Sequence, residues 1–352
     1  MNHFDINTTS SSEFGIFGIP CSPEKAQIHI TPVPWEVTTS YGAGTAQGPY
    51  LIRQASEQVD FFDLEIGKTY EVGIYMKNEP KHILDLNNTL KPLAQELIHL
   101  KTSNPELNAE QKALETRLLN QINQGCSLMT QWVYEQTKET LKLCKWPVVI
   151  GGDHSTPLGA IKAISEYYDG KVGILHIDAH ADLRKSYQGF HQSHASIMNN
   201  VLKLNPKPQK IVQVGIRDFC EEEYNFILEH PNDIKTFFDI DLKRDLFEGH
   251  TWNGICQAIS GELPEKVYIS FDVDGLDPSL CPNTGTPVPG GLSMNEAFYL
   301  MYSLHKAGKK IVGFDINEVS ASGNLEDEWN GNVGARLLYK MCGWLAKTQK
   351  LI

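Results

Sequence analysis

The chain has 352 residues, 41% of them hydrophobic, which allows one large or two smaller α/β domains with a sizeable core. Its 31 basic and 43 acidic residues give a formal net charge of −12, which argues against a surface that coats nucleic acid. No apolar run approaches the roughly 20 residues that span a bilayer. Seven scattered cysteines do not suggest a disulfide framework, and no secretory signal is recognisable at the start, so a cytoplasmic location is expected.

The N-terminal part of the chain is expected to be irregular apart from one strand and several helices. A polar arm covers about residues 1–13, and the apolar run Phe14–Pro20 predicts a strand. The segment Pro32–Arg53 is rich in glycine and proline, which predicts a loop, with a helix beginning near Gly48–Pro49. Helix formers dominate about residues 92–145, where we expect one or two long helices.

From Val148 onward the sequence alternates strand-like and helix-like segments. This alternation predicts a three-layer α/β/α fold, with a mainly parallel sheet covered by helices on both faces. No linker or internal repeat is visible, so residues 1–352 are expected to form one domain. Ligands of such sheets collect outside the carboxyl ends of the strands. The predicted strands after Val148 are Val172–Ile177, Lys210–Ile216, Lys235–Ile240, Val267–Val273 and Lys310–Ile316.

Side chains able to bind metal gather at three of these strand ends. Asp178, His180 and Asp182 stand at alternate positions, so they start on one face of a strand and can converge where it ends. Two further clusters follow the strands that begin at Val148 and Val267. The complete pool is Asp153, His154, Asp178, His180, Asp182, Asp272 and Asp274.

The composition of this pool indicates a pair of divalent ions. Carboxylate oxygens mixed with imidazoles, without cysteine, favour Mn²⁺ or a similar ion over a structural zinc. The pool is too large for one ion, whereas two bridged ions would hold a water and lower its pKa, which points to hydrolysis. Taken singly, each aspartate is better explained as the cap of a turn or helix. Together, several buried carboxylates require counter-ions.

Three segments resemble the signature motifs of the ureohydrolase (arginase/agmatinase) family. They are Gly151–Ser155, Asp178–Asp182 and Ser270–Ser279. The Pro34–Arg53 segment is similar to the substrate loop of agmatinase-type members, and Gly313–Val319 also matches the family. The helical stretch of about 78 to 140 is longer than the family's usual connection. The resemblance implies an arginase-like fold with its active site at the carboxyl ends of the strands, and hydrolysis of a guanidino C–N bond with release of urea.

The resemblance also implies a role for each metal-type residue. It implies two Mn²⁺ ions, with Ni²⁺ as an alternative. The first ion would take His154, Asp178, Asp182 and Asp272, and the second Asp178, His180, Asp272 and Asp274. Asp178 and Asp272 would therefore bridge the ions. Asp153 would support the ligands, and the usual way to do so is to orient a ligand histidine through its other nitrogen.

Two further residues are candidates for catalysis. Glu318 matches the family's glutamate that receives the planar guanidinium, with an exposed surface glutamate as the alternative. His194 is the candidate proton shuttle, because a histidine near its ordinary pKa gives and takes protons at neutral pH. Its surroundings resemble the family's Ser-His-Gly-Thr pattern but depart from it at Ala195. His191 is a rival, and a loop histidine without a role is the third interpretation.

Substrate choice is expected to depend on the loop that follows the second motif. Arg184 and Lys185 would repel the ammonium of agmatine if they face the pocket, and would pair with the carboxylate of a guanidino acid or of formiminoglutamate. The Asp-Leu-Arg run resembles formimidoylglutamase members, whereas Pro34–Arg53 resembles agmatinase. Basic loop residues are more often solvated, so agmatinase is favoured. Arg184 and Tyr187 are the candidate substrate contacts of this loop.

The expected reaction is therefore conversion of agmatine to putrescine and urea. Formimidoylglutamase, guanidino-acid hydrolase, arginase and guanidine hydrolase are alternatives on the same site. Two alternatives of other classes are a metal-binding scaffold without turnover and a deacetylase with a single zinc, and the complete set of ligands disfavours both. A homo-oligomer, a trimer or hexamer, is expected from the resemblance, and neither a nucleic acid nor a membrane is an expected partner.

Overall fold

A single eight-stranded sheet organises the chain, and all of its neighbouring strands are parallel. The computed structural model describes residues 15–104, 106–324 and 327–352, so the predicted arm of residues 1–13 lies outside them. The strand order is β2-β1-β3-β8-β7-β4-β5-β6, which confirms the predicted parallel sheet. The strands are β1 (Ile28–Pro32), β2 (Ile74–Met76), β3 (Trp146–Ile150), β4 (Gly173–Ile177), β5 (Lys210–Ile216), β6 (Ile234–Phe238), β7 (Lys266–Asp272) and β8 (Lys310–Asn317).

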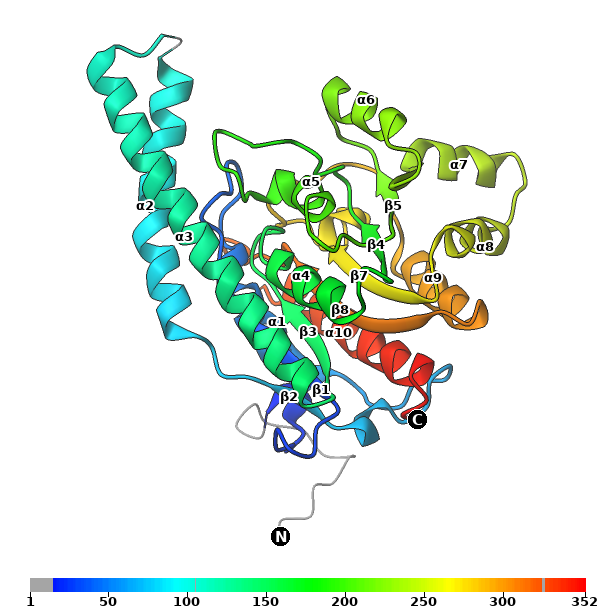
Figure 1. Ribbon diagram of the computed structural model, residues 1–352. Coiled ribbons are helices and arrows are strands. Elements are labelled where there is room, and N and C mark those ends of the chain that lie inside the picture. The colour runs from blue at the N-terminus through cyan, green and yellow to red at the C-terminus, as the bar shows by residue number, and fades with distance from the viewer. Residues whose placement is uncertain (1–14, 105, 325–326) are drawn as a thin grey trace.

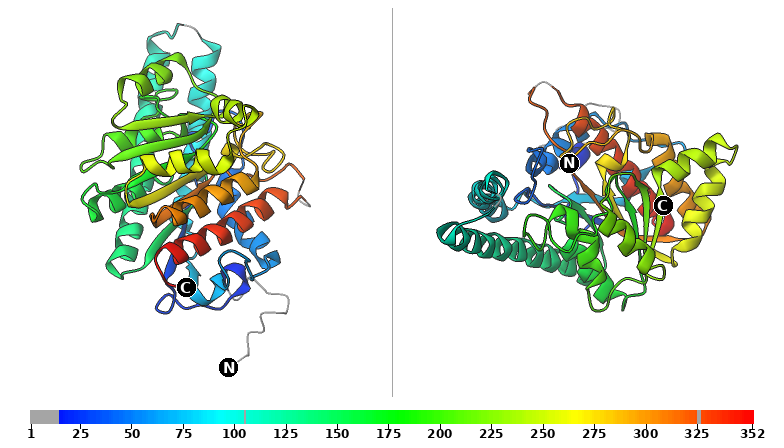
Figure 2. Two further views of the ribbon diagram at one scale, coloured as in Figure 1. Left: turned by 90° about the vertical axis from the view of Figure 1, so that its right-hand side faces the viewer. Right: turned by 90° about the horizontal axis from the view of Figure 1, so that it is seen from above.

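Helices cover both faces of the sheet and make the predicted three layers (Figures 1 and 2). Along β4, Leu175 and Ile177 belong to the hydrophobic core under α1, α8, α9 and α10, whereas Ile174 belongs to the core under α4 and α5. The alternation of side chains along a strand thus supplies both cores. The helices are α1 (Gly48–Ala55), α2 (Lys81–Ser103), α3 (Ala109–Lys142), α4 (Leu158–Tyr167), α5 (Ile197–Leu202), α6 (Glu221–Glu229), α7 (Asp239–Phe247), α8 (Trp252–Glu262), α9 (Met294–Lys306) and α10 (Trp329–Thr348). Among the described residues, no helix is both long and apolar enough to cross a membrane.

Two strand predictions require correction. The run Phe14–Pro20 does not form a strand within the described residues: Ile16–Gly18 is a short 3-10 helix in which Phe17 has a φ of 60°. The first strand among the described residues is β1. The prediction failed because a short apolar run alone does not distinguish a buried turn from a strand. The predicted strand Lys235–Ile240 ends early, at Phe238, where Asp239 begins α7. An aspartate is favourable in the first turn of a helix.

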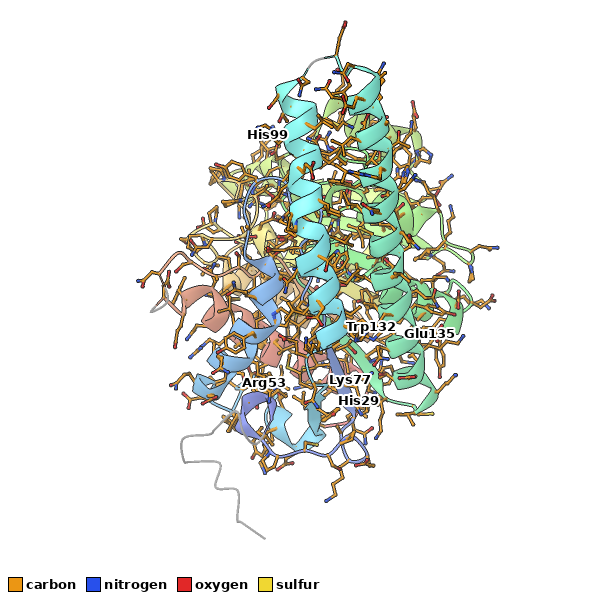
Figure 3. The ribbon with its side chains drawn as sticks, turned by 90° about the vertical axis from the view of Figure 1, so that its left-hand side faces the viewer. His29, Arg53, Lys77, His99, Trp132 and Glu135 are labelled. Atoms are coloured by element: carbon orange, nitrogen blue, oxygen red, sulfur yellow. The ribbon has the colours of Figure 1, made fainter. Side chains whose placement is uncertain are left out.

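The predicted helical segment consists of two helices, α2 and α3, which form a long hairpin on one side of the sheet (Figure 1). The hairpin begins at Lys81 rather than near Pro92, so α2 runs through a proline that costs roughly 3 kcal/mol in a helix interior. A buried stripe that includes Ile83 and Leu90 offsets this cost. Figure 3 looks onto the hairpin, with His99 towards its free end and Trp132 nearer the other end.

Candidate active site

The carboxyl ends of β3, β4 and β7 meet at one edge of the sheet, and six of the predicted metal-type residues come together there. Parallel strands bring their carboxyl ends to the same edge, so residues far apart in sequence converge. Five of the six side chains are buried, and that of His180 is partly exposed. These residues are His154, Asp178, His180, Asp182, Asp272 and Asp274.

The first group of ligand atoms surrounds one nitrogen of His154. Its Nδ1 lies 2.9 Å from Asp178 Oδ2, 3.2 Å from Asp272 Oδ2 and 3.5 Å from Asp182 Oδ2. Asp182 adopts a φ of 54°, a conformation that aspartate tolerates better than most residues. Three carboxylate oxygens and one imidazole nitrogen thus converge on a single point.

The second group surrounds His180. Its Nδ1 lies 3.0 Å from Asp274 Oδ2 and 3.5 Å from Asp178 Oδ1. Asp178 therefore places one carboxylate oxygen in each group. The ligand atoms of Asp178, His180 and Asp274 all lie within 4.8 Å of one another, which is compatible with a metal ion. Among the described residues, Asp272 contacts the imidazole of the first group, His154, but not that of the second.

The donor set fits divalent cations. Burial, followed by the negative charge of Asp178, raises the pKa of Asp182 well above its ordinary value. Burial and the neighbouring charges of Asp274 and Asp178 do the same for the pKa of Asp272. Carboxylates packed this closely without cations must take up protons, whereas bound cations would allow all of them to ionise. The residues present are therefore suited to holding metal.

Support for the shared ligand comes from His176, which was not predicted from the sequence. Gln213 Nε2 donates to the Ala181 carbonyl (2.7 Å), which fixes the orientation of its amide, and the same nitrogen lies 3.0 Å from His176 Nδ1. His176 Nδ1 is then the acceptor, so Nε2 carries the proton and donates to Asp178 Oδ2 at 2.8 Å. His176 precedes Asp178 by two positions on β4, so the alternation that identified His180 also indicates His176.

A second support acts on His154 and corrects the expected role of Asp153. The far nitrogen of His154, Nε2, contacts Ser270 Oγ at 2.9 Å, and that hydroxyl donates to Asp315 Oδ1 at 3.0 Å. Asp153 instead accepts from the Ser155 backbone N–H at 3.0 Å and from Thr38 Oγ1 at 3.3 Å. Ser270, not Asp153, therefore contacts the ligand histidine. Asp153 therefore stabilises the turn after β3, and it also contacts Thr38.

Glu318 follows the end of β8 and faces the ligand groups. Its Oε1 accepts the backbone N–H of His154 at 3.0 Å, whereas its buried Oε2 has no hydrogen-bond partner among the described residues. A side chain at Gly285 would bring its Cβ to 2.9 Å from Oε2, so the glycine leaves room beside that oxygen. Burial and the charges of Asp272 and Asp153 raise the pKa of Glu318 well above its ordinary value. A cation beside Oε2 would lower the pKa of Glu318 again and favour the ionised carboxylate.

The space beside Glu318 is small in this conformation. The cavity that it lines has a volume of about 10 Å³, close to the space that one water needs. Thr39 and Gly42 line it from one side and Gly285 from another, with His194 completing the wall. A guanidinium group would need these loops to move apart before it could bind.

The two rival histidines lie in different environments. His194 is half-buried, lines the space beside Glu318, and has its Nδ1 3.5 Å from Thr38 Oγ1. Burial, then the charges of His180 and Lys91, lowers the pKa of His194 to about 3, so it is neutral at neutral pH. His191 is exposed and lines none of the cavities described around Glu318 and the ligands. The geometry favours His194 for any contact with substrate.

A larger cavity of about 170 Å³ continues from the ligands towards the surface. Arg184 and Tyr187 both line it, and Arg184 lies over the Tyr187 ring, 5.3 Å from its centroid. Arg184 Nε is also 3.6 Å from Glu223 Oε2, a carboxylate that lines the same cavity. Lys185 instead is exposed and pairs with Glu222 at 3.4 Å. Of the two basic residues, Arg184 therefore reaches this cavity, and the buried Glu223 neutralises its charge.

The model of the arginase family matches residues 26–343 of the chain. The chain is 29% identical to the N(1)-aminopropylagmatine ureohydrolase of Synechocystis sp., covering 92% of the chain and 91% of that protein. It is 30% identical to an enzyme of the same name from Thermus thermophilus, over 94% of the chain and 97% of that protein. The solved structure of the agmatine ureohydrolase of Thermoplasma volcanium has a TM-score of 0.67 at 22% identity, covering 93% of this chain and 92% of that one.

The match spans the sheet, the three strand ends and Glu318. The His and Asp groups offer the metal site that hydrolysis in this family depends on. The chain therefore belongs to the arginase family and is a ureohydrolase, a hydrolase that acts on guanidino C–N bonds.

Proposed function

We propose that the chain is a binuclear Mn²⁺ ureohydrolase that releases urea from agmatine or from N(1)-aminopropylagmatine. The observation that carries the proposal is the pair of carboxylate–imidazole groups that share Asp178 and face the unpartnered Oε2 of Glu318. Oxygen-rich ligand sets with few imidazoles suit Mn²⁺, with Ni²⁺ as the alternative ion. When bound, two such ions lower the pKa of coordinated water and supply hydroxide near neutral pH.

In this proposal, the ions are held by the six residues predicted from the sequence. His154, Asp178, Asp182 and Asp272 hold one ion, and Asp178, His180, Asp272 and Asp274 hold the other. Each group combines negative oxygens with one imidazole nitrogen, a set of donors that suits a divalent ion such as Mn²⁺. His176 and Ser270 keep the ligands Asp178 and His154 in place.

Glu318 and His194 act on the substrate. Glu318 Oε2 receives an N–H of the guanidinium, while its Oε1 stays fixed by the backbone of His154. Binding of this cation also removes the cost of an ionised, unpaired carboxylate in a buried position. The neutral His194 lies on the other side of the same space and is the proposed group that takes up and returns the proton needed by the departing amine. For this role its pKa must rise from about 3 once the substrate is bound.

The charges around the larger cavity support a substrate with a cationic tail. Asp218 and Glu223 line the cavity, and Glu223 neutralises the single arginine, Arg184, so an ammonium is not repelled. A further cavity of about 630 Å³ shares Arg184 and Glu223 with it and is lined by Lys185 and by three additional glutamates. These are Glu221, Glu222 and Glu229. The longer tail of N(1)-aminopropylagmatine, named as the substrate in two of the relatives, would reach this acidic space.

Metal counting combined with an activity assay tests the proposal. Protein stripped with a chelator and reloaded with Mn²⁺ or Ni²⁺ is analysed for bound metal, and urea release from agmatine is measured in parallel. The proposal predicts two ions per chain and urea release that depends on them. One zinc per chain would support the deacetylase alternative, and two ions without turnover of any guanidino compound would support the scaffold.

Three predictions from the sequence stay predictions. They concern a single domain over residues 1–352, a trimeric or hexameric assembly and a cytoplasmic location. Light scattering on the purified protein tests the assembly, and localisation of the tagged protein in cells tests the compartment.

A further inference from the structure

One hydrophobic cluster joins the α2–α3 hairpin to both loops that wall the active site, the 34–47 loop and the 184–194 loop. Trp35 and Val37 from the first loop and Phe190 from the second are fully buried in this cluster. Their neighbours in the cluster include Leu90 of α2 and Met129 of α3. The hairpin is therefore packed against the substrate side of the molecule, although it carries none of the metal-type residues.

Two residues on one face of α2 hold the backbone of the 34–47 loop. Asn87 and Lys91 are four positions apart, so they project from the same side of the helix. Asn87 Oδ1 accepts the backbone N–H of Glu36 at 2.8 Å, and Lys91 Nζ donates to the Glu36 carbonyl at 2.9 Å. Lys91 Nζ also donates to the Thr39 carbonyl at 3.0 Å and to Thr39 Oγ1. The ammonium is thus directed at the backbone of this loop.

The Glu36 side chain closes the same loop from within. Its Oε2 accepts the backbone N–H of Gly44 at 2.6 Å and that of Ala46 at 3.1 Å. Residues 36–39 are consequently held from α2, while residues 44–46 are held by Glu36. The exposed Tyr41 lies between these two fixed parts, over the space beside Glu318.

Thr38 connects the held backbone to the catalytic groups. It lies between Glu36 and Thr39, the residues that Lys91 contacts. Its Oγ1 is 3.3 Å from Asp153 Oδ2 and 3.5 Å from His194 Nδ1. A shift of the 36–39 backbone would therefore move the group that faces His194.

The other wall of the site is also fastened to the hairpin. Asn123 of α3 donates to the Gly189 carbonyl at 3.4 Å and accepts the backbone N–H of His191 at 2.9 Å. Lys101 of α2 donates to the Gln188 carbonyl at 3.2 Å. Both loops thus depend on the same pair of helices for their position.

We propose that the α2–α3 hairpin is the positioning element of the active site, and that Lys91 is a positioning residue that sets Thr38, and through it His194. Lys91 touches neither the ligand groups nor the space beside Glu318 within the described contacts, so its hydrogen bonds act through the loop. Its charge also acts on His194 over a distance, and the double variant below separates this effect from the effect of the loop. The kinetic part of this proposal rests on the proposed function.

The test compares two substitutions of the same kind on the same helix. Lys91→Met keeps the length of the side chain and removes the ammonium. Lys81→Met is the matched control, because Lys81 is exposed and pairs only with Asp85 among the described residues. We expect kcat of Lys91→Met to fall about tenfold, with KM changed less than about threefold and bound metal unchanged. A kcat equal to that of Lys81→Met would overturn the proposal.

A double variant tests whether Lys91 acts through Thr38. Thr38→Val should lower kcat by a similar factor, and Lys91→Met combined with Thr38→Val should be at most about twofold slower than either single variant. Effects that multiply would show that the two residues act independently, contrary to the proposal.

Hydrogen–deuterium exchange supplies a readout that needs no substrate. Amides of residues 36–46 should exchange faster in Lys91→Met than in Lys81→Met, while the strands keep their protection. Equal exchange in the two variants would overturn the positioning role. If the unaltered protein released no urea from any guanidino compound, the proposed function would fail, and the exchange data alone would then decide whether Lys91 holds the loop.

Discussion

The two sides of the active site are built in different ways. On the metal side, ligands follow the ends of neighbouring parallel strands, and each motif occupies a few consecutive residues. On the substrate side, the walls are loops held by contacts between distant parts of the chain, such as Thr38 with His194 and Lys91 with Thr39. The difference suggests that the sheet edge determines the reaction, whereas the loops and the hairpin determine which molecule undergoes it and how fast.

The largest effect is expected on the metal side, at the shared ligand. Asp178→Ala removes a carboxylate oxygen from both groups, so we expect loss of bound metal and a fall in urea release of at least about 10⁴-fold. Metal analysis of the purified variant checks this. Asp277→Ala is the control, because Asp277 belongs to the same motif as Asp272 and Asp274 but is exposed. Two ions retained by Asp178→Ala would show that the residue is not shared.

A smaller effect is expected where the two sides meet, at Glu318. In Glu318→Gln, an amide oxygen can still accept the His154 backbone N–H, but the negative charge is lost. We expect both ions to stay bound and kcat/KM to fall about 10²- to 10³-fold, because a charge-assisted hydrogen bond becomes a neutral one. Steady-state kinetics with agmatine measures this. Loss of metal would instead place Glu318 among the ligands.

His194 should show an intermediate effect on turnover. His194→Ala removes the neutral imidazole from the space beside Glu318, and we expect kcat to fall about 10- to 100-fold with both ions retained. His191→Ala is the matched control and should behave like the unaltered protein, since that side chain is exposed. If His191→Ala were the slow variant, the shuttle would be misassigned.

The smallest effect is expected in the wall that contacts the substrate tail. Arg184→Gln removes the arginine that neutralises Glu223 and leaves that carboxylate free to attract the tail, so KM for a cationic-tailed substrate should fall about two- to fivefold. Lys185→Gln changes a residue that does not line this cavity and whose side chain is three-quarters accessible to solvent, so KM for agmatine should not change. A higher KM for agmatine in Arg184→Gln would mean that the main role of the arginine is to position the loop and not to neutralise Glu223.

The metal side was predictable from the sequence because its signal is local. Alternation along a strand identified Asp178 and His180, and the parallel sheet explains why His154 and Asp272 join them. The same alternation, applied two positions earlier, also indicates His176 on β4 and Ser270 on β7. The family motifs identify the ligands but not the residues that hold them, so the sequence does not distinguish these two supports from ordinary core residues.

The substrate side could not be predicted in the same way. Nothing near Lys91 in the sequence identifies it as a partner of the Thr39 carbonyl, which lies 52 positions away. Arg184 was expected to act through its charge, but whether that charge is free depends on Glu223, which is brought to it only by folding. The start of α2 was also misplaced, because its buried stripe outweighs the local preference of Pro92.

The central claim is that the metal side performs a urea-releasing hydrolysis while the acidic cavities select a cationic tail. Urea release from Mn²⁺-loaded protein, measured with substrates that differ in the tail, tests it most directly. The series consists of N(1)-aminopropylagmatine, agmatine, arginine, 4-guanidinobutyrate and guanidine, with ammonia release from formiminoglutamate as a separate assay. The account predicts kcat/KM for the two amine-tailed compounds at least about tenfold above the others. A preference for 4-guanidinobutyrate or formiminoglutamate would contradict it and make Arg184 the group that binds the tail.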